Sequence, residues 1–275
     1  MAYEELGSNA LEYFPCRYGK SKLLFRGPKR KLEGDYVAVL GGSETYGRFV
    51  ERPYPALAEE LLGRKVVNFG IGNAGLDVFA QDPTIRDACS RAKVTVIQIG
   101  GAQNMSNRFY AVHPRRNDRF LRASTLLKTV YRDVDFTEFN FTRHLLTALK
   151  RESAERFAMV EQELKEAWTA RMKTLVSGIE SDVVLLWLSD HPPEACVTRT
   201  ADGGDPLFVD RAMLREVSVY AAGVVEVVVS RDEITAGRER LVFGALEEPA
   251  AREMLGTVAH EKAAAALHSV LAPLL

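Results

Sequence analysis

The chain is poor in cysteine, carries no excess of charge and has no long apolar run. Its three cysteines, Cys16, Cys89 and Cys196, are too far apart for a disulfide framework or a CxxC metal site, so reduced thiols are expected. No apolar run approaches the roughly 20 residues that a membrane-spanning helix needs. A net charge of −1 over 275 residues gives no reason to expect a nucleic-acid or membrane partner.

Targeting and metal-binding signals are also missing. The first residues, MAYEELGSNALEYF, begin acidic and lack a basic stretch followed by an apolar one. We therefore expect no signal peptide and a cytoplasmic protein. No group of histidine, cysteine or acidic residues has the spacing of a metal site, so we predict no metal. No cofactor is expected either. The length and the 47% apolar composition are enough for one large α/β domain.

Short apolar runs alternate with helical patterns along the chain. The runs are rich in Val, Ile and Leu on both faces, which is typical of buried parallel strands; they cover residues 36–40, 65–69, 94–99, 183–188 and 224–229. Helices are predicted at 55–62, 77–92 with a break near Pro83, 210–222 and 258–271. This alternation favours a three-layer α/β sandwich with one doubly wound parallel sheet.

Two segments lie outside this simple pattern. Residues 1–34 form a basic N-terminal arm before the predicted α/β domain of residues 35–275. Residues 105–180, after the third strand, are read as a helical insertion. It begins with a polar, arginine-rich loop over 104–119, and helical patterns follow at 121–134, 138–150 and 153–177. The insertion is predicted to serve as a lid or as the surface of a homodimer.

The first strand leads into the sequence Gly41-Gly42-Ser43 and then into a predicted helix. A hydroxyl at the carboxyl end of a buried parallel strand stands where open α/β sheets bind ligands. The glycines allow a sharp turn and leave the serine oxygen unhindered. This pattern is typical of an enzyme, or of a protein descended from one.

The order of motifs resembles the SGNH/GDSL hydrolase superfamily. The first block of that family, G-D-S, reads Gly41-Gly42-Ser43 here. The second block, a glycine after the second strand, corresponds to the segment VVNFGIGNAG. The third block, G-x-N-D, corresponds to IGGAQN, which ends at Asn104. The resemblance covers residues 35–110 and the final helix, and it implies a flavodoxin-like parallel sheet and serine-dependent cleavage of acyl bonds.

The resemblance also implies roles for particular residues. Ser43 would be the nucleophile and His260 the base that takes its proton. The Ser43 amide, the Asn104 side chain and a second-block glycine would hold the oxyanion. That glycine is Gly72 or Gly75, with Gly75 favoured because it opens a helix. Neighbouring residues that would contact the substrate are Gly42, Glu44, Gly72 and Asn73.

The sequence departs from the family pattern at three points. Gly42 replaces the aspartate of the first block, and Asn104 is displaced by about two residues. The last block should read D-x-x-H, but Thr257 stands three residues before His260 where the aspartate belongs. His260 also falls several residues later than the family's catalytic histidine when the final helices are aligned.

Each candidate has a simpler interpretation that stays open. Ser43 could cap a helix or bind a phosphate, and Asn104 could stabilise a turn. His260 could be a solvated helix residue beside Glu261. His191 follows the fourth strand and is a second candidate base, held by the prolines after it, but a strand-exit turn is the simpler interpretation.

Basic residues just after Asn104, among them Arg115 and Arg116, predict an anionic or glycan-like substrate, unless they only form a solvated surface. The favoured function is a serine-dependent ester hydrolase or acyltransferase. The first alternative is a catalytically degraded relative that binds an anionic ligand. The second alternative is a phosphate- or nucleotide-dependent transferase that uses Gly41-Gly42-Ser43 as an anion loop.

Overall fold

A five-stranded parallel sheet forms the centre of the computed structural model, which describes residues 11–198, 200 and 204–275. The strand order is β2-β1-β3-β6-β7, the flavodoxin-like arrangement. The strands are β1 (Val37–Gly41), β2 (Val66–Gly70), β3 (Val94–Gln98), β6 (Asp182–Ser189) and β7 (Gly223–Val228). All five predicted strands are confirmed within one or two residues, because apolar residues on both faces are what a doubly covered sheet requires.

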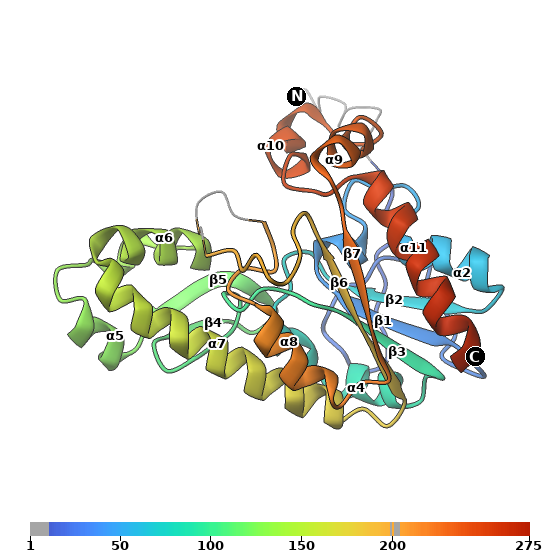
Figure 1. The fold of residues 1–275 in the computed structure, drawn as a ribbon, viewed down its shortest axis with the longest axis horizontal. Helices are drawn as coiled ribbons and strands as arrows, with labels where there is room; N and C mark the ends of the chain where they lie inside the picture. Colours follow the sequence, from blue (N-terminus) through green and yellow to red (C-terminus); the bar gives the residue numbers. More distant parts are fainter. Residues whose placement is uncertain (1–10, 199, 201–203) are drawn as a thin grey trace, which may run out of the picture.

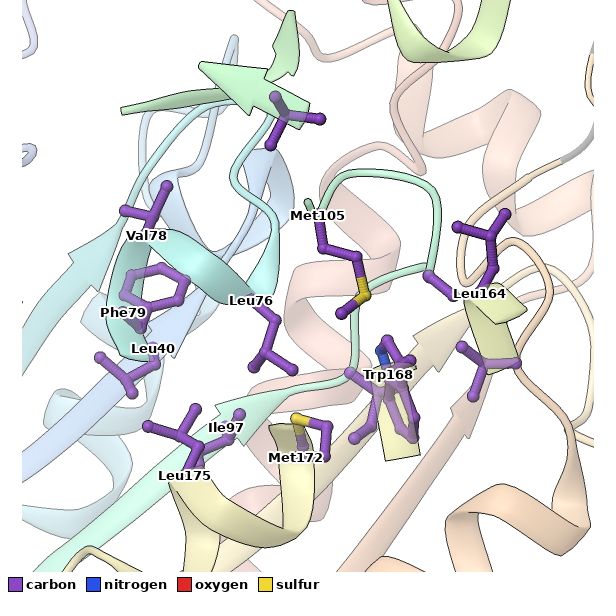
Figure 2. Close-up of a cluster of buried hydrophobic side chains, with 14 of the residues drawn as sticks. Leu40, Leu76, Val78, Phe79, Ile97, Met105, Leu164, Trp168, Met172 and Leu175 are labelled. Carbon is purple, nitrogen blue, oxygen red and sulfur yellow. The ribbon is translucent and has the colours of Figure 1, made fainter. Parts of the chain in front are cut away.

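Helices cover both faces of this sheet, which gives three layers (Figure 1). Along β1, Ala38 and Leu40 face one core cluster while Val37 and Val39 face the other. The first cluster lies under α3 (Leu76–Ala80), α4 (Pro83–Ser90), α7 (Ala154–Ser177) and α8 (Arg211–Ser218). Figure 2 shows Trp168, Met172 and Leu175 of α7 packed near the ends of β1 and β3.

The opposite face is covered mainly by the end of the chain. Helix α11 (Thr257–Leu271) places Ala263 and Leu267 in the second cluster, together with Tyr54 and Ala58 of α2 (Tyr54–Leu62). The predicted helices at 55–62 and 258–271 are confirmed, the one predicted at 210–222 is confirmed over Arg211–Ser218, and the break near Pro83 separates α3 from α4. Two helices that were not predicted, α9 (Arg231–Arg238) and α10 (Glu248–Ala251), precede α11.

The segment after β3 contains a β-hairpin in part of the region predicted to be a loop. Strands β4 (Tyr110–His113) and β5 (Arg116–Ala123) pair antiparallel, so the predicted loop over 104–119 is wrong in this part. The helix predicted at 121–134 is shortened to α5 (Thr125–Val130), which is followed by a short 3-10 helix (Phe136–Glu138), α6 (Thr142–Glu152) and α7. Because α7 packs on the sheet, it belongs to the crossover between β3 and β6.

The part of the N-terminal arm that the structure describes is packed against the sheet. Tyr18 and Phe25 are buried and both rings contact Phe69 of β2. The Arg26 guanidinium donates hydrogen bonds to the carbonyl oxygens of Gly47 and Val50 at 2.6 and 2.7 Å. Residues 1–10 of the predicted arm lie outside the described residues. None of the helices in the described parts combines the length and apolar character needed to cross a bilayer.

Candidate functional site

Ser43 is placed by a tight turn between β1 and the one-turn helix α1 (Ser43–Tyr46). A Cβ on Gly41 would lie 1.9 Å from Thr45 Oγ1, so only glycine fits there. Gln98, the last residue of β3, accepts hydrogen bonds from the Gly42 and Thr45 amides at 3.2 Å each. The turn is therefore tied to the neighbouring strand, which fixes the start of α1.

The Ser43 hydroxyl is held by Asn73. Ser43 Oγ accepts the Asn73 backbone N–H at 3.0 Å and donates to Asn73 Oδ1 at 3.1 Å. Asn73 Nδ2 in turn donates to Asp118 Oδ2 at 3.3 Å. Partial burial raises the pKa of the Asp118 carboxyl above its usual range, because the charged form loses water. An amide oxygen orients the hydroxyl proton but does not remove it, so Asn73 is a positioning residue and not a base.

Ser43 opens onto a cleft of about 450 Å³. The cleft lies outside the carboxyl ends of β1 and β3, where the strand order reverses, as in other open α/β sheets. Five of the residues singled out in the sequence line it together: Gly42, Ser43, Glu44, Asn73 and Asn104.

Asn104 reaches the cleft from the loop after β3. Its Oδ1 accepts a hydrogen bond from Thr142 Oγ1 at 2.7 Å, which assigns the oxygen as acceptor and leaves the Nδ2 protons to donate elsewhere. Gly75 lies directly against this loop, since a Cβ there would come within 1.6 Å of the Asn104 carbonyl oxygen. Neither Gly75 nor Gly72 lines the cleft, and Gly72, predicted to contact the substrate, is exposed with open space around it.

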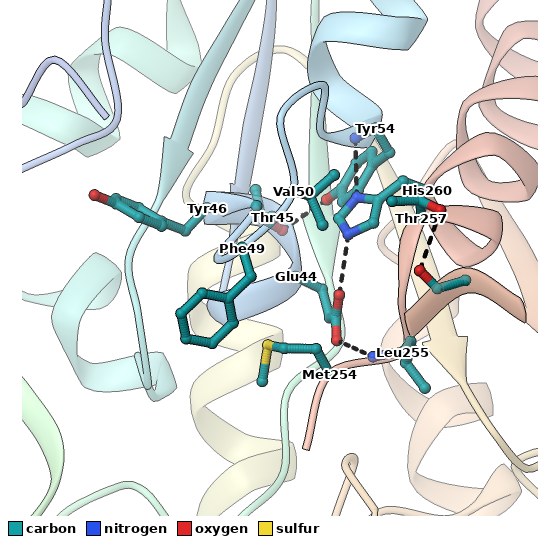
Figure 3. Close-up of polar contacts among 12 residues, drawn as sticks. Glu44, Thr45, Tyr46, Phe49, Val50, Tyr54, Met254, Leu255, Thr257 and His260 are labelled. Atoms are coloured by element: carbon teal, nitrogen blue, oxygen red, sulfur yellow. Dashed lines mark hydrogen bonds and ion pairs between the residues drawn. The ribbon is translucent and has the colours of Figure 1, made fainter. Parts of the chain in front are cut away.

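His260 is fully buried, and its ring lies between Tyr54 and Glu44 (Figure 3) and makes no hydrogen bond to the Ser43 hydroxyl. Its Nδ1 accepts the Tyr54 backbone N–H at 3.0 Å, so the ring proton is on Nε2, which lies 3.1 Å from Glu44 Oε2. Glu44 Oε1 also accepts the Leu255 N–H at 2.9 Å. His260 and Glu44 therefore tie α1 to the start of α11, and this placement does not support a base role for His260.

The last block of the chain reaches the cleft through other residues. Glu253 and Met254, which lie in the segment just before α11, line the cleft. This is the segment in which the family resemblance expects D-x-x-H. Glu253 was not predicted from the sequence, because the family pattern in this segment contains an aspartate and a histidine and no glutamate.

His191 is buried and does not line the cleft. Its Nδ1 lies 2.6 Å from Asp190 Oδ1 and 2.9 Å from Ser189 Oγ, and the hydrogen bond to His191 lowers the pKa of Asp190. Trp187 Nε1 donates to the His191 carbonyl oxygen at 2.8 Å. Among the residues that the structure describes, no histidine lines the cleft.

The charges around the cleft are mainly negative. Glu44, Asp118, Asp205 and Glu253 line it, and Arg143, which pairs with Asp205, is the one basic lining residue among those described. Arg115 and Arg116 lie exposed at the β4–β5 turn and are not part of the lining. The predicted preference for an anionic substrate, and with it an anion-loop role for residues 41–43, finds no support in this distribution. No cluster of three or more metal-ligating side chains occurs in the described parts of the chain.

Replacing His260 with alanine is expected to lower the free energy of unfolding by about 2 kcal/mol, because the buried Tyr54 N–H loses its acceptor and a cavity remains. Urea unfolding measures the change, and His268→Ala, at a half-buried position of the same helix, is the control. Ester turnover per folded molecule should stay within about threefold of wild type, whereas loss of a general base costs about 10²-fold or more. A loss of that size in fully folded protein would restore His260 as the base.

Comparisons with known proteins match the chain to one family model and to several solved structures of low sequence identity. A family model described as "Domain of unknown function (DUF6473)" matches residues 1–275, and no curated protein matches the sequence. A lipase from a goat rumen metagenome is 14% identical, with 85% of this chain and 97% of that chain covered and a TM-score of 0.40.

Two further solved structures are similar at the same level. A protein described as a GDSL-like lipase, from Parabacteroides merdae, is 15% identical, with 90% of this chain and 100% of that chain covered and a TM-score of 0.41. A gut microbial diltiazem-metabolizing enzyme is 16% identical, with 82% of this chain and 42% of that chain covered and a TM-score of 0.30.

Proposed function

The chain belongs to the DUF6473 family over its whole length, and we propose that it is a serine-dependent acyl hydrolase or acyltransferase with Ser43 as the nucleophile. One observation supports the proposal most strongly: Ser43 and Asn104 line the same cleft at the carboxyl edge of the sheet. A nucleophile and an amide donor beside one cavity are two of the parts that acyl transfer needs.

The oxyanion would be held from two directions. The Ser43 amide is at the first position of α1, where a helix provides no internal acceptor for the N–H. The Asn104 Nδ2 protons supply the second donor, since Thr142 already occupies Oδ1. Removing one such donor typically costs about 10²–10³ in rate.

The base in this proposal is a carboxylate. Asp118 is already linked to Ser43 through Asn73, and Glu253 enters the cleft from the segment before α11. A carboxylate has an ordinary pKa near 4 and is a weaker base than histidine. Modest turnover is therefore expected, and it should persist at pH values where a histidine base would already be protonated.

One observation favours a second candidate, the binding of a ligand without chemistry. The Ser43 proton points to an amide oxygen, and no histidine is found among the described lining residues. In that case Ser43, Asn73 and Asn104 would serve only as hydrogen-bonding groups for a small molecule.

A fluorophosphonate probe separates the two candidates, because it reacts covalently only with an activated serine. Intact-mass spectrometry of the wild-type protein should show one added group, and Ser43→Ala should take up none. Ser177→Ala, at the exposed end of α7, is the matched control and should be labelled like wild type. An unlabelled wild-type protein that is folded would overturn the hydrolase and leave the binding candidate.

A further inference from the structure

Gln103 carries a buried acceptor without a donor at the wall of the cleft. It is 2% exposed, and its Nε2 donates to Asp205 Oδ1 at 2.9 Å. Its Oε1 has no hydrogen-bond partner and lies against Gly101, where a Cβ would come within 2.1 Å of it. Both residues line the cleft. A buried carbonyl oxygen left unpaired costs about 1–3 kcal/mol, so a ligand N–H at this position would recover that cost.

The charge around this acceptor has one prevailing sign. Four carboxylates line the cleft, and Arg143 is the basic lining residue in the described parts. Its guanidinium lies 3.3 Å from Asp205 Oδ1, so the pair adds little net charge. Of the other three carboxylates, Asp118, whose pKa is raised by burial, is close enough to Arg116 and Arg119 for their charges to lower that pKa in part. Glu44 and Glu253 supply the remaining negative charge of the cleft, which attracts cations and repels anions.

The aromatic ring of Phe141, at the edge of the cleft, already has a cation against it. Phe141 lines the cleft and is 43% exposed, and the Arg119 guanidinium already lies 5.2 Å from its ring centroid. The ring is therefore in use as a cation–π acceptor at this edge.

We infer that the cleft takes a substrate bearing a protonated amine, whose N–H donates to Gln103 Oε1 while the surrounding carboxylates balance its charge. The inference rests on the proposed acyl chemistry at Ser43 and names its substrate class. It replaces the anionic substrate expected from the sequence with a cationic one.

Three methyl esters of similar length test the charge preference: methyl 6-aminohexanoate, methyl heptanoate and monomethyl adipate. At low salt, kcat/KM for the amine ester should exceed that for the neutral ester by at least about tenfold, with the anionic ester slowest. Raising the ionic strength to about 0.5 M should narrow the difference, because salt screens the field. Equal rates for the three esters would overturn the inference and leave the proposed function in place.

A matched pair of variants tests the acceptor. Gln103→Met keeps the length of the side chain and removes both the oxygen and the Nε2 donor to Asp205. The ratio of kcat/KM for the amine ester to kcat/KM for methyl heptanoate should therefore fall severalfold. Gln162→Met, on the exposed face of α7, should preserve the preference. An unchanged preference in folded Gln103→Met would contradict the assigned contact.

A binding measurement keeps the inference separate from catalysis. Hexylammonium should raise the melting temperature of wild-type protein, and hexanoate should not. If no ester is hydrolysed and hexylammonium still stabilises the protein, the cation site stands and the proposed function fails. If neither hexylammonium nor hexanoate shifts the melting temperature while esters are turned over, the cation site is wrong.

Discussion

The Ser43→Ala variant is expected to lose at least about 10³-fold in kcat/KM for ester hydrolysis, since the attacking atom is removed. Its free energy of unfolding should change by less than about 1 kcal/mol. The two hydrogen bonds lost are both to the exposed Asn73, which water can satisfy. Initial rates with a short-chain nitrophenyl ester, and urea unfolding of the same preparations, measure the two quantities.

The control for this variant is Ser177→Ala, whose hydroxyl bonds only to the Lys173 carbonyl within its own helix. It should match wild type in both measurements. Retention of full activity by folded Ser43→Ala would mean that the hydrolysis arises elsewhere. A loss of stability as large as the loss of activity would make Ser43 a structural residue.

Replacing Gly75 with alanine is expected to destabilise the protein by about 3 kcal/mol and to reduce turnover at the same time. The new Cβ would come within 1.6 Å of the Asn104 carbonyl oxygen and 2.7 Å of its carbonyl carbon. Backbone atoms cannot move aside as a flexible side chain does, so the Asn104 loop must shift. The Asn104 Nδ2 protons then leave the position needed for the oxyanion.

Gly72 provides the matched control three residues earlier in the same loop. A Cβ at Gly72 meets nothing within 4 Å, so Gly72→Ala should stay within about 0.5 kcal/mol of wild type. Urea unfolding compares the two variants, and ester turnover is measured on each at a temperature where both are folded. Equal stability of the two variants would show that Asn104 does not pack on Gly75.

The sequence predicts the sheet well because each strand can be recognised from a short stretch of neighbouring residues. Each buried strand is a short run of Val, Ile and Leu, and the residues that follow β1, β2 and β3 meet at one edge by topology alone. This is why Ser43, Asn73 and Asn104 were foreseen as neighbours. The hairpin was not foreseen, because β5 reads RNDRFLRA and its charged residues hide the buried positions Asn117, Phe120 and Ala123.

The rest of the site comes from contacts between distant segments, which leave no local pattern. Asp118 is brought to Asn73 by the hairpin, and Gln103 pairs with Asp205 across 102 positions of the chain. The burial of His260 could have been predicted from the spacing of apolar residues in its helix. It shares a helical face with Ala263, Ala264 and Leu267, all of which are buried, and that spacing indicates an inward-facing position.

A crystal structure of the protein after reaction with a fluorophosphonate tests the central claim most directly. We predict that phosphorus is bonded to Ser43 Oγ. The phosphonyl oxygen should lie within about 2.7–3.1 Å of both the Ser43 amide nitrogen and Asn104 Nδ2. Phosphorus bonded to a different residue, or an adduct on Ser43 whose oxygen points away from Asn104, would contradict the assignment of this cleft as an acyl-transfer site.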